Sequence, residues 1–136
     1  MESNKKMRII SGVLKGRVID FLKNTKTRPL KDAVKENIFN ILKHSNLINV
    51  KIENSNVLDL YSGVGSFGIE CISNGAEKVT FIEQDPVAAN ILNKNLIELS
   101  IENRSKVYKN KIEDILASNF NEKFHFFFFG PAIFRY

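Results

Sequence analysis

The sequence has one cysteine, Cys71, and only two histidines. A single cysteine excludes an internal disulfide, and together with two distant histidines it makes no recognisable metal site. No apolar run approaches the roughly 18 residues of a membrane-spanning helix, and the lysine-rich start lacks the apolar core of a signal peptide. We therefore expect a cytoplasmic protein without a metal ion.

Acidic residues are scarce in the first part of the chain. Residues 1–56 hold 12 Lys or Arg and five Asp or Glu, a net charge of +7, whereas residues 57–136 hold eight and ten, a net charge of −2. This asymmetry favours a basic extension that binds a polyanion, attached to a nearly neutral catalytic domain. The alternative is a bias toward Lys, Asn and Ile that spreads charge over any solvated surface. The 136 residues are the length of one domain, or of part of one.

The most informative feature that is present is a glycine-rich stretch, Asn56 to Gly68. The apolar run Val57 to Tyr61 leads into glycines at 63, 65 and 68, and a helical pattern follows up to Gly75. This pattern predicts a buried strand, a tight glycine turn and a helix whose free N–H groups face a ligand above the carboxyl end of the strand. A nucleotide-like cofactor is the first hypothesis.

Two cofactors fit this stretch. The glycine spacing, with Glu83 twenty residues beyond Gly63, satisfies the dinucleotide fingerprint. Asp59 favours S-adenosylmethionine instead, because a carboxylate in an apolar strand needs a cationic or hydrogen-bonding partner. S-adenosylmethionine offers an ammonium group, whereas a nicotinamide dinucleotide offers no amine there. The bland alternative is a glycine turn with a capping aspartate.

Further elements are predicted on both sides of the glycine stretch. Residues 8–19 form two β-branched runs around a turn with two glycines, which predicts a basic hairpin that can lie along a phosphate backbone or protect a sheet edge. Residues 32–43 predict a helix. After the glycine stretch, residues 78–83 predict a strand ending in Glu83, which can accept both ribose hydroxyls or cap the next helix. Asp85 and Pro86 begin that helix, and residues 106–110 and 124–129 predict a third and a fourth strand.

Three segments occur in the same order and spacing as in the RsmD family: RIISGVLKGR at 8–17, TRPLKDAVKENIFNIL at 27–42 and DLYSGVGSFGIECISNGA at 59–76. The chain resembles this family from residue 7 to about residue 130. Its members are small-subunit ribosomal RNA guanine-N2 methyltransferases that use S-adenosylmethionine. The resemblance implies an α/β, Rossmann-like methyltransferase fold, incomplete with about four parallel strands. It implies an RNA-binding extension at 1–50 and a partial methyltransferase domain at 51–136.

The resemblance also implies the partners and the site. The partner is small-subunit ribosomal RNA or the assembling 30S subunit, and the protein is expected to be a monomer. Leu30, Ala33 and Val64 depart from the family pattern; the first two weaken RNA contacts, and the third removes a hydroxyl near the cofactor. The implied cofactor-binding residues are Asp59, Tyr61, Ser62, Gly63, Gly65, Glu83 and Asn110, and the implied RNA-binding residues are Arg8, Lys15, Arg17, Arg28 and Lys35.

The resemblance fails at the catalytic motif. Here the family carries Asp or Asn, then Pro-Pro, then an aromatic residue, whereas this chain has Gly130, Pro131, Ala132 and Ile133. The family's acceptor aligns the exocyclic amine, and its ring stacks on the flipped base. Their loss costs on the order of a thousandfold or more in rate, so we expect an inactive or nearly inactive chain. His125 also replaces a residue that is commonly Asp.

The sequence ends at Tyr136, where such a fold normally adds three more strands. We therefore expect a truncated copy or a fragment, whose phenylalanine-rich fourth strand forms a sheet edge prone to aggregation unless an oligomer covers it. Two other functions remain open. One is a non-catalytic remnant that binds RNA or cofactor, and the other is an NAD-dependent oxidoreductase.

Overall fold

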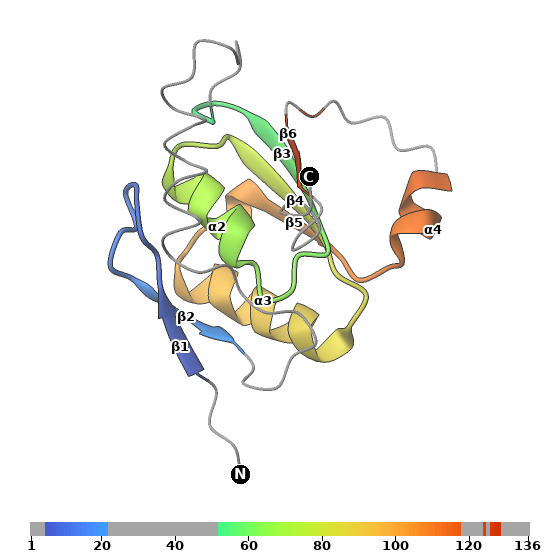
Figure 1. Cartoon of the computed structure of the whole chain (residues 1–136), viewed down its shortest axis with the longest axis horizontal. Coiled ribbons are helices and arrows are strands. Elements are labelled where there is room, and N and C mark those ends of the chain that lie inside the picture. Colours follow the sequence, from blue (N-terminus) through green and yellow to red (C-terminus); the bar gives the residue numbers. More distant parts are fainter. Residues whose placement is uncertain (1–4, 22–51, 118–123, 125, 129–136) are drawn as a thin grey trace, which may run out of the picture.

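A sheet of four parallel strands forms the centre of the computed structural model, which describes residues 5–21, 52–117, 124 and 126–128 (Figure 1). The strand order is β5-β4-β3-β6, so β6 forms one edge of the sheet. This confirms the predicted α/β architecture. The strand predicted at residues 106–110 is β5, which begins one residue earlier and ends two residues earlier. The strands are β3 (Asn56–Leu60), β4 (Lys78–Ile82), β5 (Ser105–Tyr108) and β6 (Phe126–Phe128).

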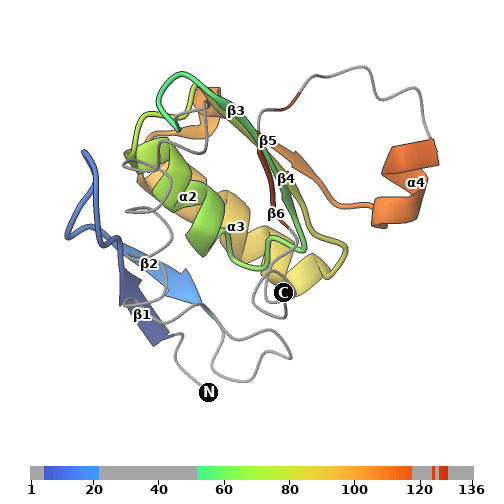
Figure 2. The same cartoon turned by 45° about the horizontal axis from the view of Figure 1, so that its top comes forward.

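Two helices, α2 (Ser66–Ser73) and α3 (Pro86–Glu98), cover one face of this sheet (Figure 2). Helix α3 begins as predicted, because the Asp85 side chain accepts a hydrogen bond from the backbone N–H of Ala88 (3.0 Å) and Pro86 occupies the first turn. A short 3₁₀ helix, η1 (Glu102–Arg104), leads into β5, and α4 (Ile112–Ala117) follows β5. No helix in the described ranges has the length and apolar character needed to cross a bilayer.

The strands alternate their side chains between two apolar clusters. Val57, Val79 and Phe81 pack with α2 and α3, whereas Leu58 and Leu60 pack on the other face with Ile82 and with Ile115 of α4. Successive residues of a strand point to opposite faces, so Asp59 shares the face of Val57, beneath the helices. The carboxylate predicted at the end of β3 therefore lies inside the molecule.

The predicted hairpin is present, but its first strand lies before the β-branched run expected from residue 8. The two antiparallel strands are β1 (Lys5–Arg8) and β2 (Val18–Phe21). It packs on α2 and α3 on the side away from the sheet (Figures 1 and 2). Ile9 and Ile19 are each 2% exposed and join the apolar cluster of the helices and the sheet. The hairpin thus shares one hydrophobic core with β3, β4, α2 and α3. The boundary near residue 50 stays a prediction, and the expected helix at 32–43 lies outside the described residues.

The turn of the hairpin is fixed on the last turn of α2. The backbone N–H of Val13 donates to the carbonyl oxygen of Ser73 (2.8 Å), and that of Ile10 donates to the Glu70 carboxylate (2.7 Å). Gly12 has a φ of 80°, and a Cβ there would lie 2.0 Å from the Ser73 carbonyl oxygen. Only glycine allows this approach.

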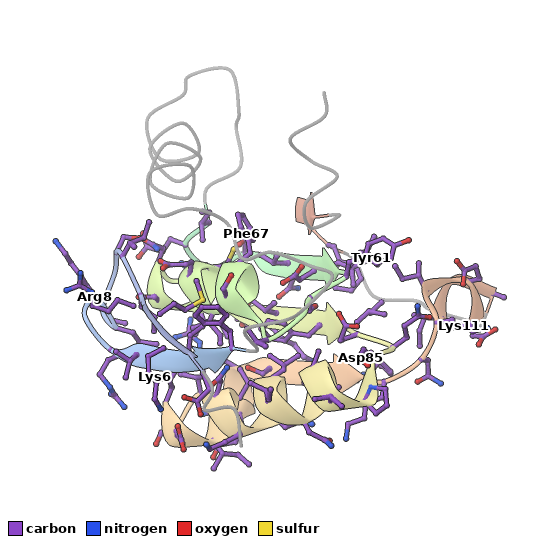
Figure 3. All side chains as sticks on the ribbon, turned by 60° about the horizontal axis from the view of Figure 1, so that its bottom comes forward. Lys6, Arg8, Tyr61, Phe67, Asp85 and Lys111 are labelled. Atoms are coloured by element: carbon purple, nitrogen blue, oxygen red, sulfur yellow. The ribbon has the colours of Figure 1, made fainter. Side chains whose placement is uncertain are left out.

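The direction of the helices places this turn in the molecule. Helices α2 and α3 start at the carboxyl ends of β3 and β4 and run back, so Ser73 and Glu98 lie near the amino ends of the strands. The hairpin turn contacts Ser73, and the Arg17 guanidinium donates to the Glu98 carbonyl oxygen (3.3 Å). Figure 3 accordingly shows Arg8 and Tyr61 at opposite ends of the molecule.

Candidate functional site

The loops after β3, β4 and β5 meet at the carboxyl edge of the sheet, where ligands bind in open α/β folds. A pocket lies there, partly open to solvent. It brings together three of the predicted cofactor residues, which come from three different loops. The residues that line it are Tyr61, Ile82, Glu83, Gln84, Asn110, Ile112 and Glu113.

Ser62, another predicted cofactor residue, is used by the glycine loop itself. Its hydroxyl donates to the carbonyl oxygen of Asp59 (2.6 Å) and accepts from the backbone N–H of Ile82 (3.1 Å). The backbone N–H of Ser62 also donates to the carbonyl oxygen of Ile82 (3.0 Å). The start of the loop is therefore fixed to β4 before any ligand binds.

Glu83 joins the loops that follow β3 and β4. Its side chain is largely buried, and one oxygen accepts from the backbone N–H of Gly63 (2.7 Å), the other from that of Asp85 (2.9 Å). Asp85 caps the next helix, and Glu83 bonds the backbone N–H of that capping residue. Each carboxylate oxygen still has acceptor capacity, so a bond to a ribose hydroxyl stays a prediction.

Asp59 is 1% exposed and has one oxygen, Oδ2, without a hydrogen-bond partner among the described residues. The carboxylate accepts a hydrogen bond from the backbone N–H of Gly68, in the first turn of α2. Burial, and to a smaller extent the nearby Glu83 carboxylate, raise its pKa to about 8. The capping alternative therefore accounts for the bond from Gly68, but not for Oδ2. Oδ2 is a buried acceptor that fits a cationic group.

Two glycines of the loop allow close packing, and the cofactor contact of Gly65 stays a prediction. Gly65 has a φ of 94°, and a Cβ there would lie 2.3 Å from Cδ1 of Leu92 on α3. A Cβ on Gly68 would lie 2.2 Å from the Phe81 ring on β4. These contacts let the start of α2 lie directly against the sheet and α3, as the last glycine of such fingerprints does.

Tyr61 occupies the mouth of the pocket with a strained backbone. Its φ is 59°, a region that residues with a side chain rarely adopt, and its side chain is 48% exposed. Such strain tends to concentrate at functional sites. The conformation turns the chain out of β3 and leaves an aromatic ring beside Asn110 and Glu83 in the lining of the pocket.

The predicted RNA-binding residues lie elsewhere. Arg8, Lys15 and Arg17 are exposed on the hairpin. Figure 3 shows Arg8 at the end of the molecule opposite Tyr61, and Arg17 bonds the last residue of α3. The eight residues of α2 alone separate the two ends by about 12 Å. Arg28, Lys35 and the motif at 130–133 lie outside the described residues.

Asn95 on α3 was not among the predicted site residues, although it contacts the glycine loop. Its side-chain amide donates to the carbonyl oxygen of Val64 (3.1 Å). The available signal was a polar residue on the helix face that also carries Ala88, Leu92 and Leu96.

A family model described as "Conserved hypothetical protein 95" matches residues 7–132. The chain belongs to this family. It is the RsmD family, as the three sequence motifs predicted.

Curated relatives carry the name "Ribosomal RNA small subunit methyltransferase D". The one from Haemophilus influenzae is 43% identical over 90 residues, which cover 66% of this chain and 44% of that protein. The one from Buchnera aphidicola (subsp. Acyrthosiphon pisum) is 34% identical over 128 residues, covering 94% and 63%. The chain thus spans about half the length of the curated relatives it matches.

Solved structures confirm the fold. The Escherichia coli protein yhhF superposes with a TM-score of 0.70 at 29% identity, covering 83% of this chain and 57% of that one. An RNA methyltransferase from Salinibacter ruber in complex with S-adenosyl-L-homocysteine has a TM-score of 0.53 at 17% identity, covering 64% and 52%. The family and the methyltransferase fold support S-adenosylmethionine as the cofactor.

Proposed function

We propose that this chain binds S-adenosylmethionine at the carboxyl edge of its sheet and serves the methylation of small-subunit ribosomal RNA. The observation that carries the proposal is the Asp59 carboxylate, buried at the end of β3 with an oxygen that has no partner in the described structure. A cation beside this carboxylate stabilises its ionised form, and the ammonium group of this cofactor supplies such a cation. A nicotinamide dinucleotide has no ammonium group to place there.

The other predicted residues fit the same cofactor. Glu83 has acceptor capacity for ribose hydroxyls, and Asn110 lines the same pocket as Glu83. The loop is held by Ile82 and Glu83 in the structure without ligand, so binding costs little further ordering of the backbone. When bound, the cofactor supplies an activated methyl group.

The exocyclic N2 of a guanine in small-subunit ribosomal RNA is the proposed acceptor, on the support of the family and its curated members. The basic hairpin lies more than about 12 Å from the pocket, counted along α2. A single nucleoside cannot reach both. The proposed substrate is therefore a folded RNA, alone or in an assembling 30S subunit, that covers both ends of the molecule.

We also propose that transfer by this chain is slow. Gly130 has no side-chain acceptor for the exocyclic amine, and Ile133 has no ring to stack on a flipped base. Positioning supplies much of the rate in such a reaction, so the loss is on the order of a thousandfold. The protein then acts mainly by binding RNA and cofactor.

Calorimetry with S-adenosylhomocysteine and with NAD tests the cofactor. We expect S-adenosylhomocysteine to bind and NAD not to bind, and we expect Asp59→Asn to weaken S-adenosylhomocysteine by about tenfold or more. Asp20→Asn is the matched control, since Asp20 is also a buried aspartate but lies on the hairpin. Tighter binding of NAD, or equal losses in the two variants, would contradict the proposal.

Labelled S-adenosylmethionine with immature small subunits tests the chemistry. Turnover comparable to that of a full-length relative would overturn the proposed slow transfer. The combined changes Gly130→Asp, Ala132→Pro and Ile133→Tyr restore the family motif and are expected to raise the rate. If they do not, the motif is not what limits transfer.

A further inference from the structure

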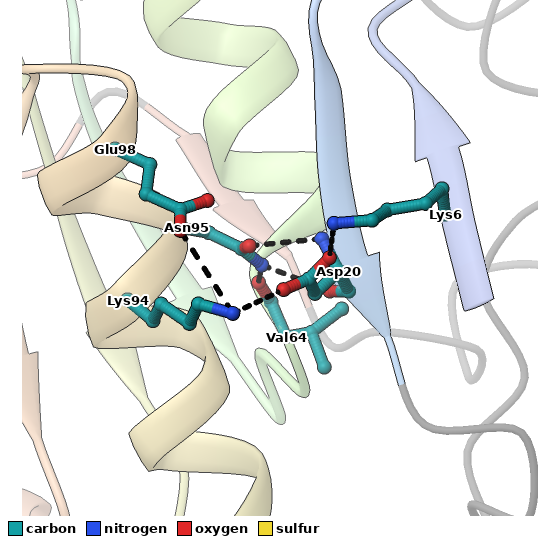
Figure 4. A network of polar contacts seen from close by, with 6 residues as sticks. All are labelled: Lys6, Asp20, Val64, Lys94, Asn95 and Glu98. Carbon is teal, nitrogen blue, oxygen red and sulfur yellow. Dashed lines mark hydrogen bonds and ion pairs between the residues drawn. The ribbon is translucent and has the colours of Figure 1, made fainter. Parts of the chain in front are cut away.

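Asn95 makes three hydrogen bonds from the buried face of α3 (Figure 4). Its Oδ1 accepts from the backbone N–H of Asp20 in β2 (2.9 Å), and its Nδ2 donates to the carbonyl oxygen of Asp20 (2.9 Å). The same Nδ2 donates to the carbonyl oxygen of Val64 in the glycine loop (3.1 Å). One side chain therefore bridges the hairpin and the cofactor loop, which are far apart in the sequence.

The orientation of this amide is fixed by its partners. Two carbonyl oxygens face its NH₂ group and one N–H faces its oxygen, so the flipped orientation would oppose donors to donors and acceptors to acceptors. Asn95 is 1% exposed, and burying an amide is unfavourable unless its hydrogen bonds are made. Its neighbours on the helix face, Leu92 and Leu96, are apolar. The polar residue is thus explained by the bonds it makes.

The glycine loop is held on its other side by β4. Ile82 fixes Ser62, and the Glu83 carboxylate fixes the backbone N–H of Gly63. Beyond these contacts the loop meets α3, where Asn95 holds the Val64 carbonyl and Leu92 packs against Gly65. Asn95 therefore supplies a polar contact that fixes the loop to the helix.

We propose that Asn95 is a positioning residue that sets the glycine loop for cofactor binding and joins that loop to the basic hairpin. The identity of the cofactor rests on the proposed function; the positioning rests on the three hydrogen bonds. Without Asn95 the Val64 carbonyl loses a buried partner and the loop is free to shift.

The variant Asn95→Ala tests this, with Lys94→Met as its matched control. Lys94 is the neighbouring residue, and its ammonium group bonds the Asp20 carboxylate (2.7 Å). Within the described structure its ammonium group contacts the carboxylates of Asp20 and Glu98, and it has no hydrogen bond to Val64 or to the backbone of β2. Both changes weaken the contact between α3 and the hairpin, so both are expected to lower the midpoint of urea unfolding. Only Asn95→Ala removes the bond to the loop.

Two readouts separate positioning from general destabilisation. Amide hydrogen exchange without ligand reports on the loop, in particular on the N–H of Gly65, which donates to the Ser62 carbonyl oxygen (3.0 Å). We expect about tenfold faster exchange in Asn95→Ala and no change in Lys94→Met. Calorimetry with S-adenosylhomocysteine should show about tenfold weaker binding in Asn95→Ala alone. If Asn95→Ala does not fold, Asn95→Ser, whose hydroxyl is too short to replace the amide, is measured instead.

Equal exchange and equal affinity in the two variants would overturn the proposal. If the unchanged protein binds no S-adenosylhomocysteine, the proposed function fails. Exchange at Gly65 then decides the positioning role by itself, because it needs no cofactor.

Discussion

At the scale of single residues, Asp59 and Asp20 are two buried aspartates with opposite environments. Asp59 lacks a cationic partner among the described residues, and burial raises its pKa to about 8. Asp20 forms ion pairs with Lys6 and Lys94, and hydrogen bonds to these lysines lower its pKa. The folded protein therefore disfavours the charged form of Asp59 and favours the charged form of Asp20.

This difference predicts the pH dependence of stability. Between pH 4 and pH 8 the folded protein holds a proton on Asp59 that the unfolded chain releases, so the free energy of unfolding falls as pH rises across that window. Asp59→Asn should flatten the fall, which is on the order of a few kcal/mol. Urea unfolding of the ligand-free protein at several pH values measures it.

Asp20→Asn is the control for this measurement. The lowered pKa of Asp20 contributes stability that is lost only as pH falls below about 4. That variant should therefore shift the profile between pH 5 and pH 8 downward without changing its slope. Parallel profiles for the unchanged protein and Asp59→Asn would contradict the assignment to Asp59.

The sequence identified Asp59 but not Asn95, and the reason is physical. A carboxylate in a strand stands out, because its neighbours on both sides are apolar. An asparagine in a helix breaks no local rule, and its partners come from the hairpin and from the glycine loop. Long-range hydrogen bonds of this kind depend on how elements pack, which spacing alone does not specify.

At the scale of elements, the hairpin was predicted from its β-branched runs and its glycines, but its docking was not. The polar residues Glu70, Ser73 and Asn74 of α2 and its cap resemble a solvated helix end in the sequence. In the structure they bind the hairpin turn; Asn74 donates to the Ser11 hydroxyl (2.8 Å). A basic segment that seemed an appendage is thus attached through specific polar contacts.

Gly12 and Gly16 provide a paired test of this docking. Both have a positive φ, 80° and 88°, but a Cβ on Gly12 would meet the Ser73 carbonyl at 2.0 Å, whereas one on Gly16 would meet nothing within 4 Å. Gly16→Ala should cost about 1 kcal/mol of unfolding free energy, from backbone strain alone. Gly12→Ala should cost about 2 kcal/mol or more. Equal losses in urea unfolding would show that the turn is not docked as described.

At the scale of the whole molecule, the cofactor edge and the basic turn lie at opposite ends of one core. Tyr61 and Glu83 line the pocket at the carboxyl edge of the sheet, and Figure 3 shows Arg8 at the opposite end of the molecule. Lys15 lies in the hairpin turn that binds Ser73. The sequence predicted cofactor-binding and RNA-binding residues but not the distance between them. That distance depends on α2 and α3, which run antiparallel to the strands. The separation exceeds the Debye length of about 8 Å at physiological salt, so the exposed charges of one end are largely screened from the other.

RNA affinity and cofactor affinity should therefore respond to different substitutions. Changing Arg8 and Lys15 together to Gln should weaken binding of small-subunit ribosomal RNA and reduce the slope of log affinity against log salt by about 1.5 to 2, as two phosphate contacts are lost. S-adenosylhomocysteine affinity should stay unchanged. Filter binding across a salt series measures the RNA affinity, and calorimetry measures the S-adenosylhomocysteine affinity. Lys111→Gln, which removes an exposed charge beside Asn110 at the cofactor edge, is the control. A salt slope that the hairpin substitutions leave unchanged would show that RNA does not contact the turn, and the hairpin charges would then serve only to keep a surface solvated.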